Sequence, residues 1–92
     1  MKSAFELAME RLGGSPIREY TAPQKEQLAE VDRMYDSRVA QARMQADSDR
    51  QKAEQDPAKL KQVQDQLTSE LASLESRRER DKDELRKQFD AA

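Results

Sequence analysis

The feature that most constrains this chain is an apolar pattern with an 11-residue period that occurs in two long arms. Starting at Leu28, steps of 3, 4 and 4 residues select seven apolar residues of eight, whereas a strict heptad from the same leucine selects four of eight. Starting at Leu60, the same steps select seven of nine and the heptad selects four of nine. This period corresponds to about 3.67 residues per turn. It predicts two long helices, each with one narrow and nearly straight apolar stripe.

Both arms begin with a capping residue and a proline. Thr21 and Gln24 form a T-x-x-Q capping box around Pro23, and Asp56 directly precedes Pro57. A proline inside a helix costs about 3 kcal/mol, whereas a proline at the first position of a new helix costs little. The sequence therefore favours a break at Pro57 over the alternative, one long helix kinked there and paired with a second chain.

Folding about this break gives an antiparallel helical hairpin over residues 22–92, with its turn near residues 54–57. In this hairpin the small side chains of one arm oppose larger side chains of the other, namely Ala53, Ala46 and Ala42 against Leu60, Val63 and Leu67. The opposition of small and large side chains lets the two backbones approach closely. The expected fold is all-α, an antiparallel coiled coil with 11-residue periodicity.

A short N-terminal helix is expected before the hairpin, at residues 1–13, with a linker at residues 14–21. Ser3 and Glu6 form a capping box, and two successive glycines end the helix. Packing of this helix on the open end of the hairpin is the first interpretation, and docking into the groove of a partner or attachment to a membrane surface are the alternatives. The residues assigned to this interaction are Phe5, Leu7, Met9, Leu12 and Phe89.

The composition argues against catalysis and against a metal site. The 92 residues include no histidine and no cysteine, which removes the commonest general base, the strongest nucleophile and the usual zinc ligands. The acidic residues near the expected turn lack the glycine and glutamate spacing of a calcium-binding loop. We therefore expect a protein that is not an enzyme and has no cofactor and no metal ligands.

The charge distribution disfavours nucleic acid as a partner. Residues 1–56 hold 9 basic and 11 acidic side chains, and residues 57–92 hold 8 of each. Binding to phosphates needs a local excess of cations, and neither half has one. The densest charge, at residues 77–87, alternates in sign without aromatic residues, which is typical of a solvated helix laced with salt bridges. A nucleic-acid- or ribosome-associated factor that uses this stripe is the alternative function.

Two cations fall on the apolar stripe itself. Arg78 and Lys82 occupy positions that the 11-residue pattern selects. A polar residue in a helix seam can set the register of the two helices at some cost in stability. We expect Arg78 and Lys82 to fix the register against Asp32 or nearby acids.

The expected function is that of a structural or protein-interaction coiled coil that associates with itself or with another helical protein. The apolar stripes are narrow, and their burial is small beside the cost of ordering the chain, about 1–2 kcal/mol per residue. Association supplies the missing burial. No segment has the apolar length of a membrane span or the apolar run of a signal peptide, and no cysteine is present, so a cytoplasmic location is expected.

The opening residues add a resemblance. The stretch KSAFELAMERL at residues 2–12, followed by APQK at residues 22–25 and a charged helix with Tyr35, resembles a group of small bacterial coiled-coil proteins of unassigned function. The resemblance implies a helical-hairpin fold in the bacterial cytoplasm. It implies no activity.

Overall fold

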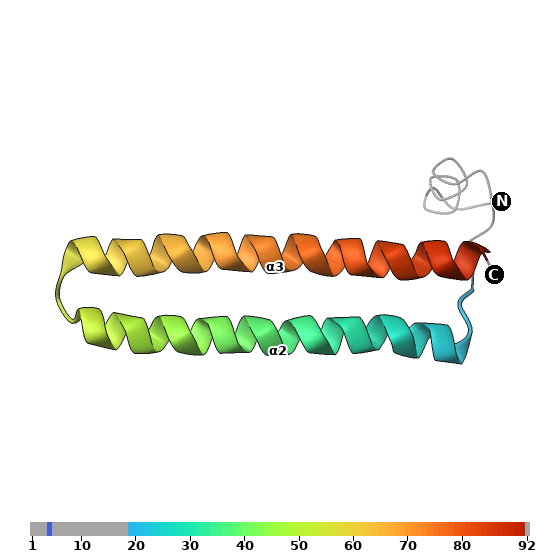
Figure 1. Cartoon of the computed structure of the whole chain (residues 1–92), viewed down its shortest axis with the longest axis horizontal. Helices are drawn as coiled ribbons and strands as arrows, with labels where there is room; N and C mark the ends of the chain where they lie inside the picture. The colour runs from blue at the N-terminus through green and yellow to red at the C-terminus, as the bar shows by residue number, and fades with distance from the viewer. Residues whose placement is uncertain (1–3, 5–18, 92) are drawn as a thin grey trace.

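The computed structural model describes Ala4 and residues 19–91, and the described residues form two long helices. Helix α2 covers Ala22–Ala53 and helix α3 covers Pro57–Ala91. The two helices lie side by side and run in opposite directions, with the turn at one end (Figure 1). The all-α antiparallel hairpin is therefore confirmed. The short helix expected at residues 1–13 lies outside the described residues, apart from Ala4.

A capping box starts α2. The Thr21 side chain accepts a hydrogen bond from the backbone N–H of Gln24 at 3.2 Å, and the Gln24 side chain accepts one from the backbone N–H of Thr21 at 2.9 Å. These two bonds use donors that a helix N-terminus would otherwise leave without a partner. The T-x-x-Q pattern in the sequence predicted this cap, and the structure confirms it.

The turn between the helices is short and reverses at Glu54. Glu54 has φ 52° and ψ −117°, a conformation that is costly for a residue with a Cβ atom. Its backbone N–H donates to the carbonyl oxygens of Arg50 at 3.1 Å and Gln51 at 3.3 Å, which closes the last turn of α2. Asp56 then caps α3, because its carboxylate accepts from the backbone N–H of Ala58 at 3.1 Å and from the next N–H at 3.2 Å.

The core follows the 11-residue pattern along its whole length. Every residue that the pattern selects in the two arms is buried or half-buried, and the most buried apolar residues all belong to it. They are Tyr35, Ala42, Ala46, Ala53, Leu67 and Leu74. Ala42, Ala46 and Leu67 form one cluster against which Val63 and Leu71 pack. Small residues of α2 thus face large residues of α3, as the sequence predicted.

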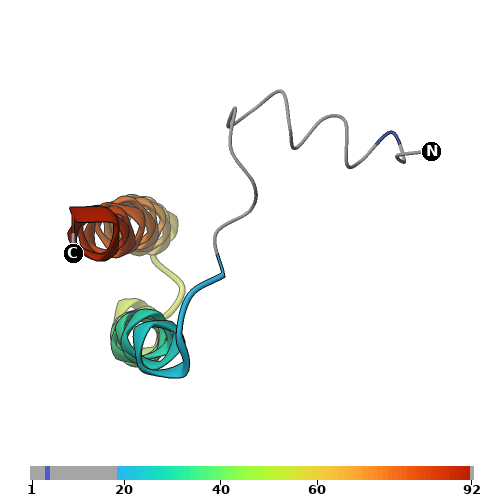
Figure 2. The same cartoon turned by 90° about the vertical axis from the view of Figure 1, so that its right-hand side faces the viewer.

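The core is one layer thick. Viewed end-on, α2 and α3 are two neighbouring cylinders, so each helix is covered along only one side by the other (Figure 2). The principal extents of the molecule are 60 × 30 × 18 Å, and Tyr35, at 3% exposed, is the most buried of its apolar residues. Within the described residues, neither helix has the length of apolar sequence needed to cross a membrane.

Candidate functional site

Two parts of the hairpin differ in what joins α2 to α3. We call residues 40–53 and 57–70 the turn half, and residues 22–39 and 71–91 the open half. The turn half is joined by the apolar cluster and by a hydrogen bond from Arg50 of α2 to Gln64 of α3, 2.8 Å long. The open half adds polar links across the seam, and these links determine which charges remain free on the surface.

Tyr35 is the centre of the polar part of the seam. Its hydroxyl donates a hydrogen bond to the carboxylate of Asp81, across from α2 to α3. This hydrogen bond, then burial and the negative charge of Asp81, raise the pKa of the Tyr35 hydroxyl, while Arg77 and Arg38 act in the opposite direction. The guanidinium of Arg38 lies over the Tyr35 ring, 5.2 Å from its centroid. The phenol is therefore held in its protonated form as a hydrogen-bond donor.

Two ion pairs cross the seam beside this tyrosine. Lys82 Nζ lies 3.2 Å from a carboxylate oxygen of Asp32, and Arg78 Nη1 lies 3.4 Å from one of Asp36. The side chains of Lys82 and Arg78 are 18% and 24% exposed, so both cations are half-buried. The structure places both cations on the seam and opposite acids of α2. Their role in setting the register stays a prediction.

An aromatic contact closes the open end. The rings of Tyr20 and Phe89 meet edge-to-face, with centroids 5.7 Å apart and an angle of 61° between the ring planes. Phe89, which was assigned to an interaction with the N-terminal helix, thus contacts the residue that precedes the α2 cap. The other residues assigned to that interaction lie outside the described residues, and their contacts stay a prediction: Phe5, Leu7, Met9 and Leu12.

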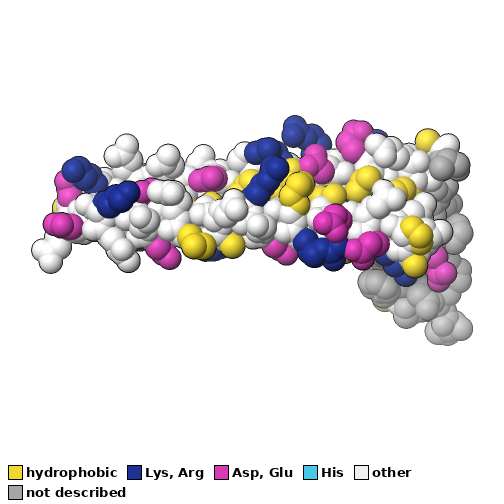
Figure 3. All heavy atoms as spheres, turned by 60° about the horizontal axis from the view of Figure 1, so that its bottom comes forward, with side chains coloured by type: hydrophobic (Ala, Val, Ile, Leu, Met, Phe, Trp, Pro, Cys, Tyr) yellow, Lys and Arg dark blue, Asp and Glu magenta, His cyan; other side chains and the backbone are white. Residues whose placement is uncertain are grey.

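A basic cluster lies on the surface of the open half. We define it as Arg38, Arg77 and Arg80. Arg38 and Arg77 both act on the pKa of Tyr35, and Arg80 lies one helical turn beyond Arg77. None of the three forms an ion pair with a described residue, whereas Arg78 and Arg86 in the same stretch do. Figure 3 shows basic side chains close together near the middle of one face, with acidic side chains beside them.

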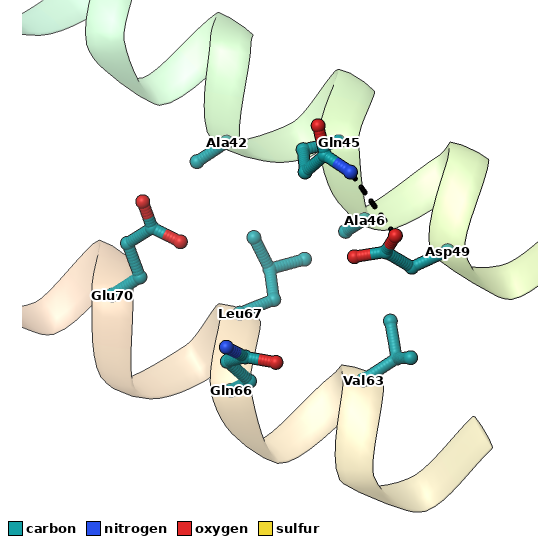
Figure 4. A pocket seen from close by; sticks show the side chains of 8 residues that line it. All are labelled: Ala42, Gln45, Ala46, Asp49, Val63, Gln66, Leu67 and Glu70. Atoms are coloured by element: carbon teal, nitrogen blue, oxygen red, sulfur yellow. Dashed lines mark hydrogen bonds between the residues drawn. The ribbon is translucent and has the colours of Figure 1, made fainter. Parts of the chain in front are cut away.

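A hollow of about 60 Å³ opens between the helices in the turn half. Its apolar lining belongs to the core cluster and its polar lining comes from both helices (Figure 4). The lining residues are Ala42, Ala46, Val63, Leu67, Gln45, Asp49, Gln66 and Glu70. Gln45 donates to Asp49 at 3.0 Å along α2. Neither Asp49 nor Glu70 forms an ion pair with a described cation.

The basic cluster and the hollow were not identified from the sequence. The alternation of charge at residues 77–87 favoured a solvated helix laced with salt bridges and did not separate paired cations from unpaired ones. A helical projection could have found the difference, because Arg78 and Lys82 fall on the stripe that faces α2 whereas Arg77 and Arg80 do not. The hollow left no such signal, since its size depends on how closely the two backbones approach.

Three further observations bear on possible sites: metal ligands, exposed apolar residues and comparisons with known proteins. The part of the chain that the structure describes has no group of three or more acidic residues placed to hold a metal ion. Met34 and Met44 are the large apolar residues that stay exposed there, at 40% and 71%. In comparisons with known proteins, no family model, no curated protein and no solved structure matches this chain.

Proposed function

We propose that this protein is a non-enzymatic structural or interaction protein that works in the cytoplasm through association of helices, first of all with further copies of itself. The observation that supports this is the thin core. Helices of 32 and 35 residues share six buried apolar residues, three of which are alanine. Ordering each residue costs about 1–2 kcal/mol, and so few buried side chains offset only part of that cost.

A second layer of helices supplies the missing burial. One side of each helix is covered by its neighbour, and the other sides still carry apolar surface such as Met34 and Met44. Helical bundles bury such surface by packing pairs of helices against each other. Another helical protein can supply the same layer, so a hetero-association belongs to the same proposal.

Sedimentation equilibrium over a wide concentration series, with circular dichroism on the same samples, tests the proposal. We expect dimers or larger species, and a helix content and thermal stability that rise with protein concentration because association is linked to folding. A fully helical monomer at every concentration would contradict the thin-core argument.

The alternative, a nucleic-acid- or ribosome-associated factor, is favoured by the basic cluster. Three arginines that form no ion pair with a described residue can neutralise about three phosphates, which gives a slope of log affinity against log salt of about −2 to −3. A salt titration of binding to RNA and DNA separates the two functions. Self-association predicts no binding at physiological salt, whereas steep salt-dependent binding that Arg77→Glu abolishes would favour the alternative.

A further inference from the structure

We propose that two copies of this chain pair antiparallel through α3, so that Arg77 and Arg80 of each copy lie at the rim of the other copy's hollow. This inference rests on the proposed self-association and names the charged contacts that orient it. The pairing surface consists of the exposed residues of α3 between the hollow and the basic cluster, namely Gln66, Glu70, Ser73, Arg77 and Arg80.

The spacing along α3 makes this surface self-complementary. Glu70 and Arg77 are seven residues apart, which places them on the same side of the helix about 10 Å from each other. A two-fold axis across the helix near Ser73 exchanges these two positions. Glu70 of each copy then lies beside Arg77 of the other, and the contact occurs twice, as in any isologous interface.

The same operation brings Arg80 to the hollow. Arg80 is three residues beyond Arg77, and the axis places it near Gln66 of the other copy, on the rim of the hollow. Asp49 and Glu70 are the acids of that rim. Arg77 thus meets Glu70, and Arg80 comes to the rim that also holds Asp49, so two arginines that form no ion pair with a described residue approach two carboxylates that form none.

On the opposite side of the hairpin, the described charged residues beside the seam are paired across it, Asp36 with Arg78 and Asp32 with Lys82. Arg50 is likewise engaged, with Asp47 and with Gln64 at 2.8 Å. Charges that form no ion pair with a described residue lie further from the seam, such as Arg43 and Glu79. Complementary charges orient a partner and exclude wrong alignments. The free charges therefore favour a second copy on the side of the hollow, in the antiparallel orientation.

Charge-reversal variants test the pairing. Glu70→Arg alone places arginine against arginine twice in each dimer, and Arg77→Glu alone places glutamate against glutamate twice. We expect each variant to weaken homodimers by about tenfold or more, as measured by sedimentation equilibrium. An equimolar mixture of the two variants restores both attractive contacts, so heterodimers form with close to the wild-type affinity, and the double variant behaves like the wild type.

The matched controls reverse charges elsewhere. Glu79→Arg on α3 and Arg43→Glu on α2 change exposed residues that form no ion pair with a described residue and lie off the pairing surface. We expect both controls to leave the dimer affinity within about twofold, because surface substitutions away from specific contacts have only small effects. Circular dichroism of every variant confirms that the hairpin itself is formed.

The outcomes separate the two proposals. A wild-type chain that stays monomeric overturns the self-association and this pairing together. If the wild-type chain associates but the mixture of Glu70→Arg and Arg77→Glu forms no preferred heterodimer, the α3 pairing alone is overturned. If the charge reversals lower the helix content, Glu70→Gln and Arg77→Gln replace them. The pairing is overturned if both glutamine variants dimerise with the same affinity as the wild type.

Discussion

The turn half and the open half share one apolar period but differ in how far charged side chains join their helices. In the turn half, Ala42 and Ala46 pack against Leu67, so small side chains admit a large one and the backbones lie close. In the open half, Tyr35 reaches Asp81 and Lys82 reaches Asp32 through hydrogen bonds and charge. Burial in the turn half is non-directional and insensitive to salt, whereas the links of the open half are directional and depend on salt and pH.

The comparison also bears on the surfaces. The open half contains the basic cluster, and the turn half contains the hollow with its two acids. A parallel alignment of two copies would place like surfaces together, whereas an antiparallel alignment pairs unlike ones. In the proposed dimer, the different charges of the two halves therefore favour the antiparallel orientation.

Leu67→Ala breaks the turn half and is expected to have the largest effect. Leu67 is 6% exposed and central to the core cluster, so its truncation should lower the free energy of unfolding by about 2–5 kcal/mol. Urea unfolding at one fixed protein concentration measures the change. Gln41→Ala, at an exposed side chain of α2 outside the core cluster, is the control and should stay within about 0.5 kcal/mol. Equal losses for the two variants would refute the assignment of the core.

Ala46→Leu tests whether small residues are required in the turn half. Ala46 is 5% exposed beside Leu67, and a larger side chain there should push the helices apart and cost about 1–3 kcal/mol in the free energy of unfolding. Ala40→Leu introduces the same side chain at an exposed position of α2 and should be close to neutral. A stabilising effect of Ala46→Leu in urea unfolding would mean that the helices are not closely packed at this point.

The hairpin and its seam could be predicted from the sequence because both follow from the order and spacing of residues along the chain. The 3-4-4 spacing identifies which residues face inward, and Asp56 with Pro57 identifies where the chain reverses; each is a local property of an α-helix. The pattern selected Tyr35, Ala46 and Leu67 without any knowledge of their partners, and all three are buried.

The polar contacts could not be predicted to the same degree, because they depend on the exact offset between the two helices. From the sequence we expected Arg78 and Lys82 to pair with Asp32 or nearby acids. A shift of one helical turn between α2 and α3 decides whether each cation meets Asp32 or Asp36. Asp81 lies at the edge of the stripe, where periodicity alone cannot say whether a side chain points toward Tyr35 or to solvent. The free charges of the basic cluster are what remains once these pairs are known.

A double-mutant cycle on Lys82 and Asp32 measures the open half directly. Lys82→Met, Asp32→Asn and their combination should give a coupling energy of about 0.2–1 kcal/mol in urea unfolding, because the pair is partly exposed. The coupling should fall in concentrated salt, whereas the effect of Leu67→Ala should not. A coupling that is zero at low salt would show that the pair contributes nothing to the open half.

Tyr35→Phe distinguishes the two halves by how the free energy of unfolding depends on pH, and it has the smallest expected effect. The hydrogen bond to Asp81 and burial raise the pKa of Tyr35 in the folded chain above its unfolded value of about 10. The stability that this hydroxyl contributes is therefore fully present below pH about 10 and is lost as the pH rises through the folded pKa. The free energy of unfolding of the wild type should exceed that of Tyr35→Phe at neutral pH, and the difference should shrink once phenolate absorbance shows Tyr35 ionising. Leu67→Ala, which removes no titrating group, should keep a constant deficit over the same range, and a Tyr35→Phe deficit that is equally constant would contradict the hydrogen bond to Asp81.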